Sequence, residues 1–365
     1  GALRYEGRVV ARADGGTVSV DYRTLRVRNA VSVSLLVAAA TSFVVYRTVD
    51  AEPAARVARV LEAAANRSYS VLRSDHVAEH RSWFRRVSLT LGDGSRDAVP
   101  TDRRLAESDS ISDPGLGALT YQFGRYVLIA SSRPGTQAAN LQGIWNDNPN
   151  PWWDSKYTVN VNLPMNYWPA ETAGLPELAA PLFDLVRDVS EAGRSVAREH
   201  WGARGWVLHQ NTDLWRATAP MDGPSWGAWP VGGAWLVTHL AEHDRFARDD
   251  GFVRTWYPVL RDQTRFLADI LVEHPDRGWL VTAPSNSPEN FPAYPGNGRY
   301  FDETSGLFLK GRMMQPGPTM DNEIVKSVFD AFIDWSSRLG SDAEMRAEVA
   351  TKRDRLPPMQ IGKHG

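Results

Sequence analysis

Apolar and polar residues alternate along the first part of the chain. Residues 18–37 carry apolar side chains at many second positions, after an Asp-Gly-Gly turn signal. A period of two is typical of strands that bury one face. Residues 4–49 are therefore predicted to form antiparallel strands joined by hairpins. The apolar spacing becomes helical over residues 53–86, and a last strand is predicted at residues 87–91.

Beyond residue 117 the strand pattern largely disappears and helical spacing dominates. Residues 92–116 are rich in Gly, Asp, Ser and Pro, which predicts a linker with a short helix near residues 101–107. Long loops rich in Trp, Asn, Pro and Gly separate the later helices, and loops of that length are usually functional. Helical pairs separated by such loops suit an α/α toroid with an active site at one rim. The predicted helices cover residues 119–131, 165–200, 229–246, 252–273, 320–339 and 342–355.

The composition narrows the possible partners. The formal net charge is -2, whereas a phosphate-binding surface usually needs a strong basic excess, so nucleic acid is not expected as the main partner. The chain has no cysteine, which excludes disulfides and thiolate metal sites. No apolar run reaches the length of a membrane span, so no membrane partner is expected. The N-terminus lacks the basic and apolar regions of a signal peptide and is interpreted as a position inside a longer protein.

Two matches to the pattern His-x-x-Glu-His are consistent either with a metal site or with a structural role. They begin at His76 and His239. Two histidines four residues apart share a helical face, as zinc ligands do, but a third ligand and a catalytic context are also needed. Because the pattern occurs twice, the favoured interpretation is solvated or capped helix faces, and no metal is predicted.

Asn160 and Asn162 form the first candidate site. They alternate in a stretch predicted to be extended, so both side chains should face one way. Each carboxamide offers an acceptor and two donors without charge. The pair could hold a water molecule or a sugar hydroxyl. The alternative is a pair of turn or cap asparagines just before a helix.

A second candidate segment, residues 206–216, is dense in Trp, His, Asn and Asp. The whole chain has 14 tryptophans, and tryptophan serves both as core filling and as a platform for the apolar face of a sugar. His209, together with Trp226 and Trp229 beside Gly and Pro, is a candidate for ligand contact. Trp235 is expected in the core. The alternative is a Trp-rich helix interface.

The third candidate is Glu289, a single carboxylate in a loop between prolines. Partial burial beside Phe291 would raise its pKa, as an acid catalyst requires. The neighbouring Asn290 is a candidate sugar contact. The alternative is a loop glutamate paired with an arginine. Glycoside hydrolysis normally needs a second carboxylate. Weak candidates for this second carboxylate are Asp213, Asp222, Asp302, Glu303 and Asp321. Asp321 is better explained as a negative charge at the N-terminus of a helix.

Several long motifs, in order, resemble glycoside hydrolase family 95. They are LQGIWN, SKYTVNVNLPMNYWPAE, WPVGGAWL, APSNSPEN and LPPMQIGKHG. The resemblance implies inverting hydrolysis of α-L-fucosides, typically fucose α-1,2-linked to galactose in a fucosylated oligosaccharide or glycan, without a metal or organic cofactor. It implies that Glu289 is the general acid and that Asn160 and Asn162 help to activate the water. The base would be an Asp downstream of Gly365.

The same resemblance implies the domain organisation. Residues 1–92 would be the C-terminal part of an N-terminal antiparallel β-sandwich, residues 93–116 a helical linker, and residues 117–365 the first part of an incomplete (α/α)6 toroid. The chain by itself is then expected to be inactive and poorly soluble. The family favours a secreted or periplasmic location, although the chain shows no signal peptide.

Two other functions remain open from the sequence. One is a different (α/α)6 carbohydrate enzyme, such as an α-L-galactosidase or a disaccharide phosphorylase. No Gly-rich or basic loop suggests the phosphate site that a phosphorylase needs. The other is a non-catalytic sugar-binding protein that uses the Trp-rich loops.

Overall fold

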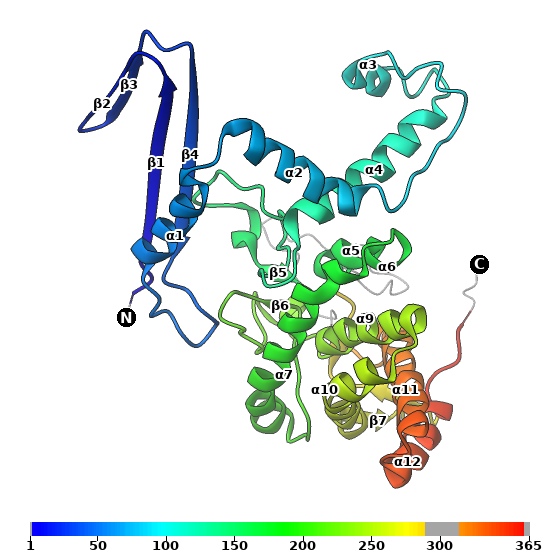
Figure 1. Ribbon diagram of the computed structural model, residues 1–365. Helices are drawn as coiled ribbons and strands as arrows, with labels where there is room; N and C mark the ends of the chain where they lie inside the picture. The colour runs from blue at the N-terminus through cyan, green and yellow to red at the C-terminus, as the bar shows by residue number, and fades with distance from the viewer. Residues whose placement is uncertain (1, 289–313, 361–365) are drawn as a thin grey trace, which may run out of the picture. The chain divides into compact units, whose positions relative to one another are not determined.

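A computed structural model describes residues 2–288 and 314–360 (Figure 1). The chain divides into two compact units, Gly1–Arg86 and Val87–Gly365. The domain limits expected from the resemblance, at residues 92 and 116, stay a prediction.

The first unit is built on a long antiparallel strand pair. Strand β1 (Tyr5–Asp14) pairs with β4 (Ser32–Thr41) along its whole length, and β2 (Thr17–Asp21) forms a hairpin with β3 (Thr24–Arg28). These four strands confirm the predicted hairpins. Helices α1 (Pro53–Ala65) and α2 (Tyr69–Phe84) follow, as their apolar spacing predicts. Helix α1 contacts both β1 and β4.

One face of this strand pair stays open within the described residues. Val9 pairs with Val37 in the ladder, and Ala11 with Leu35. Val37 is 71% exposed and Leu35 is 56% exposed. No second sheet covers these side chains in the described part of the unit, so the β-sandwich remains an expectation from the resemblance.

The predicted strand at residues 87–91 is wrong. This segment has no strand pairing. A strand needs a neighbour for its backbone groups, and here the carbonyl of Val87 instead accepts a hydrogen bond from the Arg125 guanidinium at 2.9 Å. The short helix predicted near residues 101–107 is confirmed as α3 (Thr101–Ala106).

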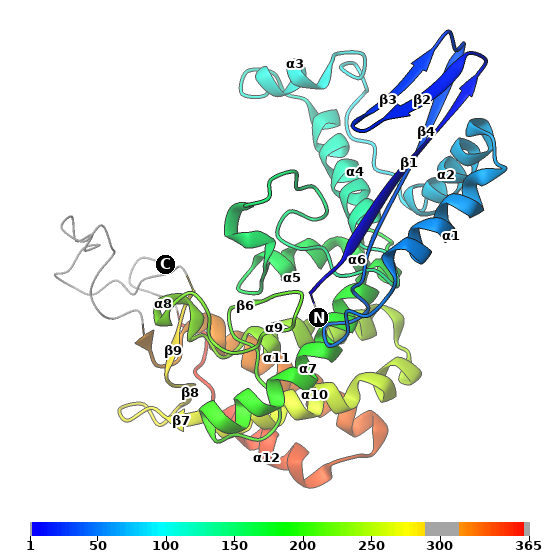
Figure 2. The ribbon, with the colours of Figure 1, turned by 90° about the vertical axis from the view of Figure 1, so that its left-hand side faces the viewer.

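The second unit is a body of packed helices. Helix α9 (Gly232–Ala247) contacts α7 (Ala180–Trp201), α10 (Asp250–Ile270) and α11 (Thr319–Leu339), and Figure 2 shows α7 beside α10. Helix α12 (Ala343–Asp354) packs on α11, and α4 (Pro114–Ser131) follows α3 near the start of the unit. This arrangement is compatible with an α/α toroid. The largest fully buried side chains include Trp206, Trp229, Phe266, Phe329, Phe332 and Trp335.

Glycine and proline residues explain where several of the helices end. Helices α7 and α11 stop at Gly202 and Gly340, whose φ angles of 62° and 63° are left-handed and favour glycine. The window 165–200, predicted as one helix, is broken into α5 (Asn162–Tyr167), α6 (Pro169–Thr172), the 3-10 turn η2 (Pro176–Ala179) and α7. Pro169 and Pro176 cannot continue a helix, because proline has no backbone N–H to donate.

Short strand pairs tie the loops to the helical body. Strand β5 (Tyr157–Thr158), after the 3-10 turn η1 (Trp152–Ser155), pairs with β6 (Asn211–Thr212), which precedes the short helix α8 (Pro224–Gly227). Strands β7 (Leu271–Glu273) and β8 (Leu280–Thr282) form a second pair, and β9 (Ser285–Asn286) and β10 (Met314–Gln315) a third. Within the described ranges, no helix is both long and apolar enough to cross a membrane.

Candidate functional site

The β5–β6 pair brings together two of the three candidate segments. Thr158 pairs with Asn211, and the Val159 amide donates to the Gln210 carbonyl at 2.7 Å. The asparagine-rich segment therefore lies directly beside the segment of residues 206–216. The sequence identified both segments but gave no sign that a two-residue ladder would join them, because a strand that short has no readable periodicity.

Asn160 and Asn162 occupy different backbone states. The extended stretch ends at Thr158, so the prediction that both residues lie on one strand is wrong. Asn160 sits in the turn that follows and is 5% exposed, whereas Asn162 is half-buried and begins helix α5. Pro164 favours this early helix start, because a proline in the first turn loses no helical hydrogen bond.

His209 is an interior residue with both ring nitrogens engaged. Nδ1 lies 2.7 Å from the Thr218 carbonyl, and Nε2 accepts a hydrogen bond from Trp201 Nε1 at 3.3 Å. These partners require the tautomer that carries its proton on Nδ1. Burial lowers the pKa of His209 to about 4, so the ring is neutral near pH 7. The ring is fully buried, which differs from the expected contact with sugar.

The tryptophans of the second segment also differ from expectation. Trp229 is completely buried, and its indole N–H donates to Asp321 Oδ1 at 2.8 Å. Trp235, expected in the core, is half-buried and lines a cavity. Trp229 can be buried because its indole N–H has a buried acceptor, the carboxylate of Asp321. Trp226 is 40% exposed and stays a predicted ligand contact.

Asp321 is a buried anchor between three segments. It lies in the first turn of α11, as predicted, but its side chain also accepts hydrogen bonds from the hydroxyls of Thr282 and Ser285, both at 2.6 Å. Burial raises the pKa of Asp321 to about 6, because the charged form loses its hydration. Asp321 thus connects three residues that are distant in sequence. This connecting role could not be predicted from the sequence.

The structure describes residues 283–288 of the third segment. Strand β9 ends three residues before Glu289, and Met314 pairs with Asn286. Ser285, in β9, is the residue that Asp321 anchors. Glu289, Asn290, Asp302 and Glu303 lie outside the described residues, so their roles stay predictions.

The other candidate carboxylates have structural partners. Asp213 Oδ1 accepts the backbone N–H groups of Trp215 at 2.9 Å and Ala217 at 3.1 Å, so this carboxylate builds the turn of its loop. Asp222 accepts from Lys156 and from Asn211. These contacts give both carboxylates a structural role in the arrangement of their loops.

The second His-x-x-Glu-His match lies on α9 and is used for packing. His239 Nε2 lies 3.1 Å from the Pro164 carbonyl, and His243 Nδ1 lies 2.6 Å from Glu171 Oε1. Each ring therefore contacts a neighbouring short helix, α5 or α6. Within residues 2–288 and 314–360, no group of three His, Asp or Glu side chains is placed to hold a metal ion.

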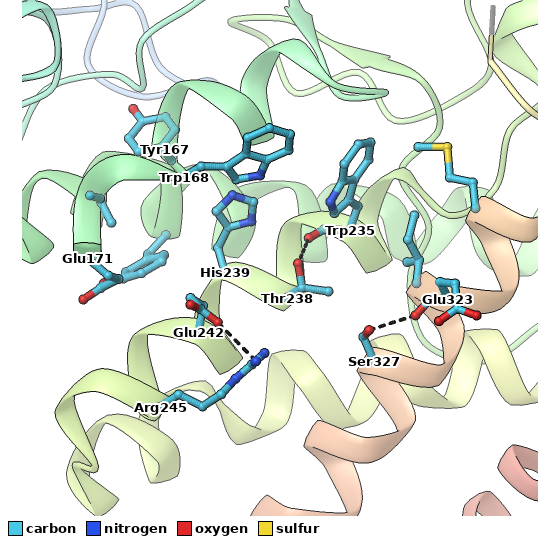
Figure 3. A pocket seen from close by; sticks show the side chains of 15 residues that line it. Tyr167, Trp168, Glu171, Trp235, Thr238, His239, Glu242, Arg245, Glu323 and Ser327 are labelled. Carbon is cyan, nitrogen blue, oxygen red and sulfur yellow. Dashed lines mark hydrogen bonds and ion pairs between the residues drawn. The ribbon is translucent and has the colours of Figure 1, made fainter. Parts of the chain in front are cut away.

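A cavity of about 520 Å³ lies among α5, α6, α9 and α11. Figure 3 shows the indoles of Trp168 and Trp235 near the imidazole of His239, with Glu242 ion-paired to Arg245 at 3.2 Å. The cavity wall contains none of the candidate asparagines. Asn162 and Tyr167 are the two ends of α5, which at ~1.5 Å per residue separates them by about 8 Å along the axis. The cavity and the asparagine loop are therefore neighbouring but distinct features.

Polar atoms around β5 and β6 are left without partners. Buried acceptors with no hydrogen-bond partner in the described part of the chain include Asn160 Oδ1, Gln210 Oε1, Asn211 Oδ1 and Thr212 Oγ1. Such a buried atom costs about 1–3 kcal/mol if it stays unsatisfied. A group of them marks a place that takes up water or a hydrogen-bonding ligand.

Comparison with known proteins identifies the relatives of this chain. The model of the glycosyl hydrolase family 95 catalytic domain matches residues 68–365. Alpha-L-fucosidase 2 of Arabidopsis thaliana is 37% identical over 366 residues, covering 97% of this chain and 42% of that protein. Probable alpha-fucosidase A of Aspergillus niger is 32% identical over 322 residues, covering 86% of this chain and 38% of that protein. The chain thus spans less than half the length of these relatives.

A solved structure supports the fold. A putative kojibiose phosphorylase from the human microbiome superposes with a TM-score of 0.60 at 11% identity, covering 97% of this chain and 44% of that chain. At this identity the likeness concerns the fold alone.

Proposed function

The chain belongs to glycoside hydrolase family 95, and from this premise we propose that it carries the proton donor and the water-positioning asparagines of an α-L-fucosidase. The observation that supports the site most directly is Asn160. Its Oδ1 is buried and unpaired beside β6 within the described residues, as expected of an acceptor that holds a water molecule. The names of the relatives support the substrate class.

The proposed reaction is hydrolysis with inversion. Glu289, protonated, donates its proton to the glycosidic oxygen as the bond to the anomeric carbon breaks. A water held by Asn160 and Asn162 attacks that carbon from the opposite face and gives its proton to a base. Inversion requires about 6.5–9.5 Å between the two carboxyl groups, which leaves room for the water.

The base of this reaction comes from outside the described residues. Asp213 is held by two backbone N–H groups, Asp222 by Lys156 and Asn211, and Asp321 is fully buried. The proposed substrate is fucose α-1,2-linked to galactose at the end of an oligosaccharide or glycan.

The Glu289→Gln substitution in the whole protein tests the role of the acid. General acid catalysis contributes about 10²–10⁴-fold, so release of fucose from 2'-fucosyllactose should fall by that factor. α-L-Fucosyl fluoride has a leaving group that needs no proton, and its hydrolysis should be much less affected. The matched control is Glu323→Gln, which changes a cavity-lining glutamate on α11 and should leave both rates unchanged.

The result also separates the competing functions. Equal loss on both substrates would remove Glu289 from the role of acid. A wild-type protein that binds L-fucose but hydrolyses neither substrate would instead be a sugar-binding protein. Faster hydrolysis of the matching α-L-galactoside than of the fucoside would make the enzyme an α-L-galactosidase.

A further inference from the structure

Asn211 presents a fixed acceptor that has no partner in the described chain. It lies in β6 and is 3% exposed. Its Nδ2 donates to Asp222 Oδ2 at 2.6 Å, while its Oδ1 is buried and unpaired among the described residues. A carboxylate only accepts hydrogen bonds, so Asp222 fixes which end of the amide is the nitrogen. The oxygen must then face the other way.

Lys156 holds this carboxylate in place. Its ammonium lies 2.9 Å and 3.0 Å from the two oxygens of Asp222. Lys156 immediately precedes β5, and Asn211 lies in β6, so the three side chains join both strands to the loop that carries Asp222. The opposite charges of Lys156 and Asp222 cancel, and the carboxylate polarises the amide that it accepts from, which makes Oδ1 a stronger acceptor.

Asn211 and Asn160 lie at the same end of the β5–β6 ladder. Asn211 pairs with Thr158, and the hydrogen bond from the Val159 amide to the Gln210 carbonyl continues this register by one step. Asn160 follows this register in the turn directly after β5, and its side chain is buried, as that of Asn211 is. Both offer an unpaired amide oxygen there.

We propose that Asn211 binds substrate in the fucoside site, its Oδ1 accepting a hydrogen bond from one ring hydroxyl of the fucose. This inference rests on the proposed function, because it assigns the same site a further contact. A hydroxyl fits better than a cation. Calcium takes six to eight oxygen ligands, usually with carboxylates among them, whereas Asp222, the carboxylate that contacts Asn211, is already paired with Lys156.

The decisive experiment compares sugars that differ by one hydroxyl. Binding of L-fucose and of its 2-, 3- and 4-deoxy analogues to the whole protein is measured by calorimetry, for the wild type and for Asn211→Ala. The variant should bind L-fucose about tenfold more weakly, as expected for one lost hydrogen bond to a fixed acceptor. One deoxy analogue should bind the wild type and the variant equally, because the contact is already missing.

Two further variants test how the amide is held. Asp222→Ala frees the Asn211 amide to rotate and should reproduce most of the loss for L-fucose, with the same analogue insensitive to the change. The matched control is Asp269→Ala, which removes a carboxylate that anchors Arg204 at 2.7 Å in another loop and should leave L-fucose binding unchanged. Thermal unfolding of each variant checks that the fold is kept. If Asn211→Ala does not fold, Asp222→Ala and the wild type with the three analogues still decide the question.

The outcomes separate this inference from the proposed function. Equal weakening of all four sugars by Asn211→Ala, or no weakening of any, overturns the contact, the first pattern being that of a bound structural water. A wild type that binds no L-fucose overturns it as well. If the wild type binds L-fucose with the predicted pattern but releases none from 2'-fucosyllactose, the contact stands and the hydrolytic function fails.

Discussion

Asp321 should make the stability of the helical unit depend on pH. The carboxylate is fully buried and accepts hydrogen bonds from Trp229, Thr282 and Ser285. Burial nevertheless outweighs these donors and raises its pKa from 3.8 to about 6. The folded state therefore binds this proton more tightly than the unfolded state does. The stabilisation from proton binding is complete below about pH 4 and is lost as the pH rises through about 6.

The magnitude follows from the two pKa values. They differ by about two pH units, and each unit corresponds to about 1.4 kcal/mol, which gives about 3 kcal/mol for this side chain. Asp321→Asn imitates the protonated acid at every pH. Its free energy of unfolding should rise relative to the wild type by about 3 kcal/mol between about pH 4 and about pH 8. Other carboxylates cancel in this difference.

Urea unfolding followed by tryptophan fluorescence and circular dichroism, at intervals across this pH range, measures the difference. Ser285→Ala provides an internal check. Removing a hydroxyl that donates to Asp321 should raise the pKa of its carboxyl further, so the loss of stability with pH should be larger in this variant and should extend to higher pH than in the wild type. A flat difference between wild type and Asp321→Asn, or a wild type that gains relative to the variant as the pH rises, would refute the reasoning.

Two substitutions test the packing that supports the site. Arg338 forms an ion pair with the buried Asp244; Arg338→Met leaves that charge unpaired and should lower the free energy of unfolding by about 3 kcal/mol or more, measured by urea unfolding. Gly205 has a φ of 72°, and a Cβ there would lie 1.8 Å from the Asp262 carbonyl oxygen. Gly205→Ala should cost about 3 kcal/mol or more, whereas the control Gly202→Ala, with a φ of 62° and open space, should cost about 1–2 kcal/mol.

Periodicity predicted the elements whose pattern repeats over many residues. The strands of residues 5–41 and the helices α9, α10 and α11 were visible because one face of each is regularly apolar. The segment of residues 87–91 has the composition of a strand but no partner strand among the described residues. Pairing is a tertiary property, so the sequence could not distinguish the two cases.

Two of the predicted segments lie side by side in the structure, but several of their side chains differ from expectation. The motifs placed Asn160 and the segment of residues 206–216 in loops, and the structure joins them through β5 and β6. Burial decided the rest. Trp229 is buried with its indole N–H donating to Asp321, 92 residues away in sequence. His209 is buried with hydrogen-bond partners for both ring nitrogens. A partner 92 residues away leaves no local signal in the sequence.

The stereochemistry of fucose release tests the central proposal most directly. The whole protein is mixed with 2'-fucosyllactose, and the anomeric protons are followed by NMR from the first minute. The account predicts that L-fucose appears first as the β-anomer, with the α-anomer following only by mutarotation. Initial release of the α-anomer, release that requires phosphate, or no release of fucose would contradict it.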